Sequence, residues 1–168
     1  SGGVTTQDID SSSNNTQTIV QIGADQTAIQ SIVEGSTWNM QTANQYGAAH
    51  ESNQSIFAGS YNIQFVEQTG DTNHDSLQEI DSGIGNIQTV NQEGGGSSHL
   101  AQQFVFEGSG NNMLSKQTGS GAKTSLVEVG NFNTAVSGGD FNVITHTQTG
   151  AGVQNATTQI SNGSSFNL

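Results

Sequence analysis

Residues 62–70 read NIQFVEQTG and residues 86–94 read NIQTVNQEG, and six of the nine positions are identical. Between Asn62 and Gln68 the shared residues fall mainly at every second position. A period of two is typical of a β-strand, because successive side chains of a strand point to opposite faces. Each stretch ends at a glycine, where a chain can turn sharply. The pair therefore predicts a strand and a turn that recur after 24 residues.

The nine-residue pattern occurs five times, and in each copy a glycine follows the first asparagine by eight residues. The copies begin at Asn15, Asn39, Asn62, Asn86 and Asn111. Between them lies a second pattern, in which a small residue, a glutamine and an aliphatic residue follow one another at every second position. This second pattern begins at Gln26, His50, His74 and His99, and the stretch from Gly3 follows it through Gln7 and Ile9.

Two alternating patterns with a fixed period predict the fold. Periods of 20–50 residues are typical of solenoids, propellers or arrays. One coil per 24 residues places every residue beside its own equivalent one turn away, which hairpins would not do. We therefore expect an all-β fold, a β-solenoid of about seven coils with two facing parallel sheets, stacked further into a cross-β filament. Residues 1–168 are expected to form one domain, with regular repeats in 3–119 and degenerate repeats in 120–168.

The spacing between coils explains the choice of residues. Neighbouring strands lie about 4.8 Å apart, so a Gln amide reaches the Gln of the next coil, as in cross-β amide ladders. Buried amides cost free energy unless they are paired, so a ladder must be nearly complete. The predicted core amides are Gln17, Gln21, Gln30, Gln41, Gln45, Gln54, Gln64, Gln68, Gln78, Gln88, Gln92, Gln103 and Gln117. The predicted apolar core is Ile19, Ile32, Ile56, Val66, Ile80, Val90 and Val105, and the predicted turn glycines are Gly23, Gly47, Gly70, Gly94 and Gly119.

The pattern weakens after residue 119. Residues 121–130 keep an aliphatic residue and the glycine but carry Ser125 and Lys123 at two pattern positions. Residues 131–139 and 142–150 both read as weak copies of the first pattern. The short distance between these two copies predicts a register shift or a trimmed turn.

Composition excludes several classes of partner. The chain has 14 acidic residues and two basic ones, a formal net charge of −12, so binding of nucleic acid or of an anionic membrane surface is not expected. No apolar run reaches the roughly 18 residues that span a bilayer, so membrane insertion is not expected either. Cysteine and proline are both absent. Without proline every backbone N–H can join a sheet. Because no signal segment is visible, any export signal is expected to have been removed.

The repeat resembles the curlin repeat. That family pattern reads Ser-x5-Gln-x-Gly-x-x-Asn-x-Ala-x3-Gln. Its Gln-x-Gly part matches here from Gln21, Gln45, Gln68, Gln92 and Gln117, with Asn in place of the leading Ser. Its small-residue site matches Ala28, Ser52, Ser76 and Ala101. The chain departs from the pattern at the last position, where an aliphatic residue replaces Gln and a Gln stands two residues earlier.

This resemblance implies a secreted bacterial protein, a subunit of the curli amyloid fibres on the cell surface and in the biofilm matrix. It further implies a homopolymer formed end to end, with a nucleator subunit and a secretion channel as partners. The acidic charge is more similar to a major subunit than to a nucleator. Two other functions fit a solenoid: a monomeric binding module of the adhesin or ice-binding type, and a polysaccharide-cleaving β-helix enzyme.

No enzyme chemistry is predicted from the motifs. The sequence shows no Ser-His-Asp order, HExxH or GxSxG, and Asp71-x-Asn73-x-Asp75 lacks the Gly and Glu of a calcium loop. We therefore expect no catalytic residue, no metal site and no cofactor. His50, His74 and His99 share one column, which could bind a metal or sense pH. The sequence favours the simpler interpretation, in which they are turn residues tolerated at the start of a strand.

Overall fold

The computed structural model describes residues 2–95, 98–129 and 142–160, and these form strands and turns without a helix. The strands are β1 (Val4–Ile9), β2 (Thr16–Ala24), β3 (Thr27–Val33), β4 (Met40–Ala48), β5 (Glu51–Phe57), β6 (Ile63–Gly70), β7 (His74–Asp81), β8 (Ile87–Glu93), β9 (His99–Phe106), β10 (Asn112–Thr118), β11 (Lys123–Val129), β12 (Val143–Thr149) and β13 (Gln154–Ile160).

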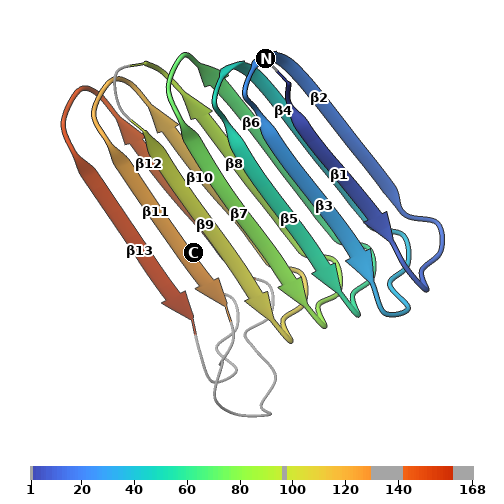
Figure 1. The fold of residues 1–168 in the computed structure, drawn as a ribbon. Helices are drawn as coiled ribbons and strands as arrows, with labels where there is room; N and C mark the ends of the chain where they lie inside the picture. The colour runs from blue at the N-terminus through green and yellow to red at the C-terminus, as the bar shows by residue number, and fades with distance from the viewer. Residues whose placement is uncertain (1, 96–97, 130–141, 161–168) are drawn as a thin grey trace.

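The strands form two sheets that face each other. The odd-numbered strands make a seven-stranded sheet in the order β1-β3-β5-β7-β9-β11-β13, and the even-numbered strands make a six-stranded sheet from β2 to β12. Each coil thus gives one strand to each sheet, and the coils stack from one end of the molecule to the other (Figure 1). The prediction of a β-solenoid with two parallel sheets is confirmed. The described strands number thirteen, slightly fewer than seven complete coils would need.

The register keeps equivalent residues side by side. Gln64 of β6 pairs with Gln41 of β4 on one side and with Gln88 of β8 on the other. Along the central strands buried and less buried residues alternate strictly. Because side chains alternate between faces, every coil directs the same Gln and aliphatic positions inward.

Aliphatic side chains from both sheets fill the space that the amides leave. Ile32, Ile56 and Ile80 are fully buried in one cluster, and Val66 and Val90 are buried in another. Ile19 differs from the prediction, since its side chain points inward but is only half-buried. The reason is its place on β2, the edge strand of the six-stranded sheet.

The turn glycines are required by backbone shape and by close packing. Gly47 has a φ of 122°, a value that side chains of L-residues rarely adopt. A Cβ atom at Gly47 would also overlap the carbonyl group of Gly70 in the next coil. Gly23, Gly70, Gly94 and Gly119 share this arrangement with the following glycine. A glycine column therefore lets the coils approach at this turn.

The C-terminal coils correct one expectation. On its C-terminal side, β10 pairs with β12. Asn142 follows Asn111 in the column of leading asparagines, 31 residues further along the chain. Elsewhere this distance is 23 to 25 residues. The predicted shorter spacing was therefore wrong, because the chain between β11 and β12 is longer than in other coils. Residues 131–139, predicted as a further copy, and residues 161–168 lie outside the described ranges.

Candidate assembly site: polar ladders and solenoid ends

The longest amide ladder runs through six coils on the six-stranded sheet. Each Gln donates a hydrogen bond from Nε2 to Oε1 of the next Gln, at 2.9 to 3.0 Å. Its members are Gln21, Gln45, Gln68, Gln92, Gln117 and Gln148. Gln148 was not among the predicted residues, although its place before Thr149 and Gly150 matches the repeat.

The second amide hydrogen fixes the direction of this ladder. Gln45 Nε2 also donates to the Thr27 carbonyl at 2.9 Å, and Gln68 Nε2 donates to the Glu51 carbonyl at 2.8 Å. These carbonyls belong to the facing sheet, so the amides tie the two sheets together. A carbonyl accepts only from the nitrogen of an amide, so the amide cannot be reversed without losing this bond. All donors consequently point toward the C-terminal end.

The other two Gln ladders run in the same direction. One joins Gln17, Gln41, Gln64 and Gln88 and stops where Met113 takes the next place. The other joins Gln7, Gln30, Gln54, Gln78 and Gln103 on the seven-stranded sheet. Beyond Gln103 the bonds pass through four side chains, Ser115, Ser125, His146 and Thr158. Gln17 and Gln21 are only half-buried, because β2 is an edge strand.

The leading asparagines form a fourth ladder, which the sequence interpretation missed. Asn62 Oδ1 accepts from the Asn86 backbone N–H at 2.9 Å, and Asn62 Nδ2 donates to the Gly83 carbonyl at 2.8 Å. The same pattern continues through Asn15, Asn39, Asn86, Asn111 and Asn142. The sequence does contain a signal for this ladder, because Asn begins every copy of the first pattern. The asparagines thus join successive coils at these turns, beside main-chain bonds such as that from Ile63 N–H to the Asn86 carbonyl.

The histidine column lies inside the solenoid, which contradicts the interpretation of these residues as tolerated turn residues. His50, His74 and His99 are buried, and their rings stack with centroids 5.0 and 4.6 Å apart. They point inward because they occupy the same phase as the core positions of β5, β7 and β9. Burial, and to a smaller extent the neighbouring His99 and His50, lower the pKa of His74 to about 4.

The column continues beyond the histidines in both directions. Gln26 precedes His50, and Lys123 follows His99 in the register of β9 and β11. The Lys123 ammonium is buried and donates to the carbonyls of Gly121 and Gly150, at 2.8 and 2.9 Å. A buried lysine at a Gln or His position was not predicted. Two main-chain carbonyls compensate for part of its lost hydration.

Among the described strands, β1 and β2 at one end and β13 and β12 at the other end lie at the edges of the two sheets. At the N-terminal end, Val4 and Ile9 of β1 are 56% and 46% exposed, although Ile9 continues the buried column of Ile32. At the other end of the described strands, Gln148 is the last described member of its ladder, and its Nε2 donates to the Thr124 carbonyl at 3.0 Å. The first Gln of each ladder therefore directs its amide oxygen toward the N-terminal end, and among these oxygens Gln21 Oε1 accepts from the Thr5 hydroxyl at 3.0 Å.

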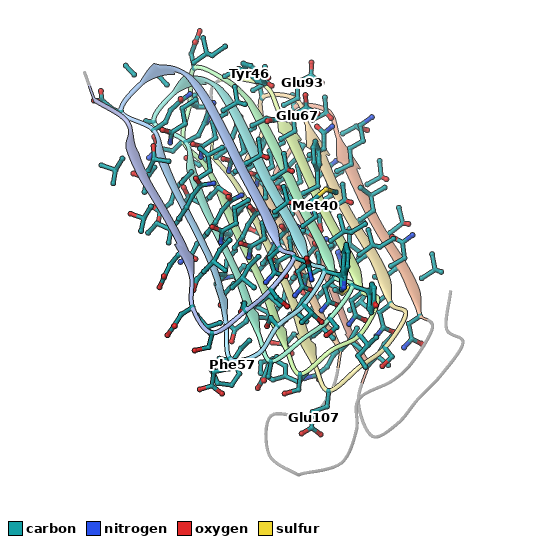
Figure 2. All side chains as sticks on the ribbon, turned by 90° about the vertical axis from the view of Figure 1, so that its right-hand side faces the viewer. Met40, Tyr46, Phe57, Glu67, Glu93 and Glu107 are labelled. Carbon is teal, nitrogen blue, oxygen red and sulfur yellow. The ribbon has the colours of Figure 1, made fainter. Side chains whose placement is uncertain are left out.

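The two outer faces differ in charge. The face of the seven-stranded sheet carries six carboxylates, from Asp8, Glu51, Asp75, Glu79, Asp81 and Glu128. The face of the six-stranded sheet carries Glu67, Glu93 and Lys116 among threonines and apolar side chains. Figure 2 shows Met40, Glu67 and Glu93 standing on the outside of this second sheet. Most of the strand-borne negative charge is thus on one face.

Comparison of the chain with models of protein families, with curated proteins and with solved structures finds no match. Within residues 2–95, 98–129 and 142–160, no three His, Cys, Asp or Glu side chains are grouped to hold a metal ion. The same ranges contain no helix that is long and apolar enough to cross a membrane.

Proposed function

We propose that this protein is a structural subunit that polymerises end to end into β-solenoid fibres. The observation that carries the proposal is the pair of terminal coils within residues 2–95, 98–129 and 142–160, where the described strands leave a sheet edge that has no further described strand beside it. Solenoids that stay monomeric usually cover their terminal coils with a polar or helical cap. An uncovered edge offers N–H and C=O groups to another chain.

The direction of the ladders favours a head-to-tail joint. Two N-terminal ends would bring amide oxygens against amide oxygens. At a head-to-tail joint the described ladders of both copies keep one donor direction, and β13 of one copy can pair with β1 of the next in the parallel arrangement of the seven-stranded sheet. A head-to-tail joint that does not close into a ring gives a filament. The same joint would continue the column of Ile9 and Ile32 into the next subunit.

The resemblance to the curlin repeat extends the proposal to a biological setting. A fibre of this kind would be a functional amyloid, secreted to the bacterial surface and the biofilm matrix. A nucleator subunit and a secretion channel would be its partners. Immunogold microscopy of intact producing cells tests this setting, because labelling confined to the cell interior would contradict it.

Negative-stain electron microscopy of the purified protein in physiological salt tests polymerisation directly. We expect unbranched filaments, with a meridional reflection near about 4.8 Å in fibre diffraction. Protein that remains monomeric for days at high concentration would contradict the proposal. That result would support the alternative function, a monomeric β-solenoid binding module.

A proline at the N-terminal edge provides a sharper test. Val4 N–H donates to the Gln26 carbonyl and so faces β3. In a parallel strand the direction of the N–H groups alternates, so Thr5 N–H faces the open edge. Thr5→Pro should therefore leave the strand content unchanged in circular dichroism and abolish long filaments. Thr5→Val, which loses the Thr5 hydroxyl bond to Gln21 Oε1 but keeps the backbone N–H, is the matched control and should still polymerise.

A further inference from the structure

The stacked histidines have a feature that the ladders do not share. Both ring nitrogens of His74 and of His99 are buried without a well-aligned hydrogen bond to a described residue. Main-chain groups such as Thr69 and Gly94 near His74 and Gly119 near His99 favour protonation, but burial outweighs them and the pKa of both rings is lowered. In His50 only Nε2 is bonded, to the Tyr46 carbonyl at 3.0 Å. A neutral imidazole tolerates such surroundings better than an imidazolium, which has two N–H donors and a full charge to compensate.

The close stacking makes more than one positive charge in this column unfavourable. The ring centroids of His50, His74 and His99 are within 5.0 Å of their neighbours, and the rings are nearly parallel. Two imidazoliums at this distance would repel each other in a buried site with little screening. Lys123 lies next in line and would repel a charge on His99.

We propose that the histidine column is a proton-operated switch, which holds β5, β7 and β9 together while its rings are neutral and loosens them when the rings are protonated. The inference rests on the solenoid fold and does not require polymerisation. It assigns a role to side chains that neither the amide ladders nor the terminal coils explain.

Other ionisable groups around the column do not cancel this effect. Lys123 is the charged group inside the solenoid, and Asp75 is the outward carboxyl on β7 that interacts with His50. From the six-stranded sheet the column meets backbone carbonyls of Thr69 and Gly94. Besides Asp75, the carboxylates nearest to the column along the chain are on Glu51, Asp71 and Glu93, and all three side chains are exposed.

The direction of the effect follows from the pKa shifts. In the unfolded chain a histidine has a pKa of about 6.5, whereas burial and the adjacent rings lower the pKa of His74 to about 4 in the folded protein. Burial and Lys123 lower the pKa of His99 as well. The unfolded chain therefore binds protons first, and stability is lost as the pH falls from about 6.5 to about 4.

Asp75 contributes with the opposite sign. Burial raises the pKa of Asp75 above the ordinary 3.8, so this group lowers the stability of the folded protein as the pH rises toward that raised value. His146 has a pKa lowered by burial and adds to the same acid loss from the last coil. Only a variant that removes the column can separate its effect from these two groups.

The test compares the wild type with the triple variant H50Q/H74Q/H99Q. Glutamine is a matched replacement, because Gln26 and Gln154 already occupy this column. Urea unfolding midpoints of freshly purified, unpolymerised protein are measured by circular dichroism from pH 7 to pH 4. We expect the midpoint of the wild type to fall steadily and that of the variant to fall at most about half as much. Equal slopes would overturn the proposal.

If the triple variant does not fold at pH 7, NMR titration of the imidazoles in the wild-type protein tests the proposed switch instead. Protonation of His74 near pH 4, together with loss of the β5, β7 and β9 signals, would support the switch. A His74 that titrates near pH 6.5 with these strands intact would overturn it. Filament microscopy is a separate readout, so failure of the switch and failure of polymerisation can be distinguished.

Discussion

A glutamine suits this core because one amide accepts a hydrogen bond from the preceding coil, donates one to the next coil and donates to the facing sheet. Gln68 is fully buried, accepts from Gln45 and donates to Gln92 and to carbonyls of the facing sheet. An aliphatic side chain of similar size could fill the space but could not meet the neighbouring amides. Since a buried unpaired amide costs free energy, each member of the ladder protects the next.

Replacing Gln68 by leucine should therefore destabilise the solenoid beyond the loss of its own bonds. Gln45 would lose an acceptor and Gln92 a donor, at about 1–3 kcal/mol for each unsatisfied group. Denaturant unfolding followed by circular dichroism measures the change. Thr69→Ala, at the neighbouring exposed position, is the control and should change the stability by less than about 0.5 kcal/mol. Similar losses in both variants would contradict the inward assignment of Gln68.

A glycine in the stacked turn should be equally intolerant of change. Gly47→Ala forces a Cβ into the Gly70 carbonyl and demands a φ that alanine rarely adopts. We expect a loss of at least about 2 kcal/mol, again from denaturant midpoints. Gly95→Ala meets no atom within 4 Å and should be nearly neutral. If both variants unfold at the same midpoint, close approach of the turns does not limit stability.

At the scale of the elements, the alternation and the period were sufficient to predict most strands. Strands such as β6 and β8 follow directly from the quoted repeat. The connection from β11 to β12 was not predictable in this way, because weak repeats in residues 131–139 and 142–150 read alike. Only the pairing of Asn142 with Asn111 shows which copy continues the column.

The candidate site was predictable where a residue repeats in phase, and less so where its type changes. The Gln positions follow from periodicity alone. The inward direction of His50 also follows from its phase, but the sequence does not show that a turn packs tightly enough to bury an imidazole. The burial of Lys123 was still harder to predict, because it depends on hydrogen bonds to the carbonyls of Gly121 and Gly150. The chemistry of a buried column is thus decided by tertiary contacts.

The asparagine ladder makes a prediction about turns. Asn86→Ala removes the Oδ1 that accepts the Asn111 backbone N–H at 3.0 Å and frees the Gly108 carbonyl. Hydrogen exchange at the Asn111 amide should become faster, by about tenfold or more for a lost bond of about 1.4 kcal/mol. Asn91→Ala, on the outer face of β8, keeps this bond and serves as the control. Unchanged protection of Asn111 would show that the side chain does not hold the turn.

For the whole molecule, the proposed attraction between subunit ends would compete with electrostatic repulsion. The formal net charge is −12, and a filament repeats this charge at every subunit. Because most of the carboxylates on strands lie on the face of the seven-stranded sheet, stacked subunits would align like charges along one side of the proposed fibre. Acid would neutralise this face but would also protonate the buried histidines, so the two effects oppose each other. Salt screens exposed charges and leaves buried ones nearly unaffected, so it isolates the repulsion.

Raising the ionic strength at neutral pH should therefore accelerate polymerisation. Between about 10 and 150 mM the screening length falls from about 30 to about 8 Å, which removes most repulsion between neighbouring subunits. Thioflavin fluorescence or turbidity against time gives the rate. The variant E79Q/D81N carries two fewer charges on the acidic face and should polymerise faster than the wild type at low salt, with a smaller acceleration on adding salt. Faster assembly of the wild type at low salt would show that attraction between charged groups, and not the ends of the ladders, drives the subunits together.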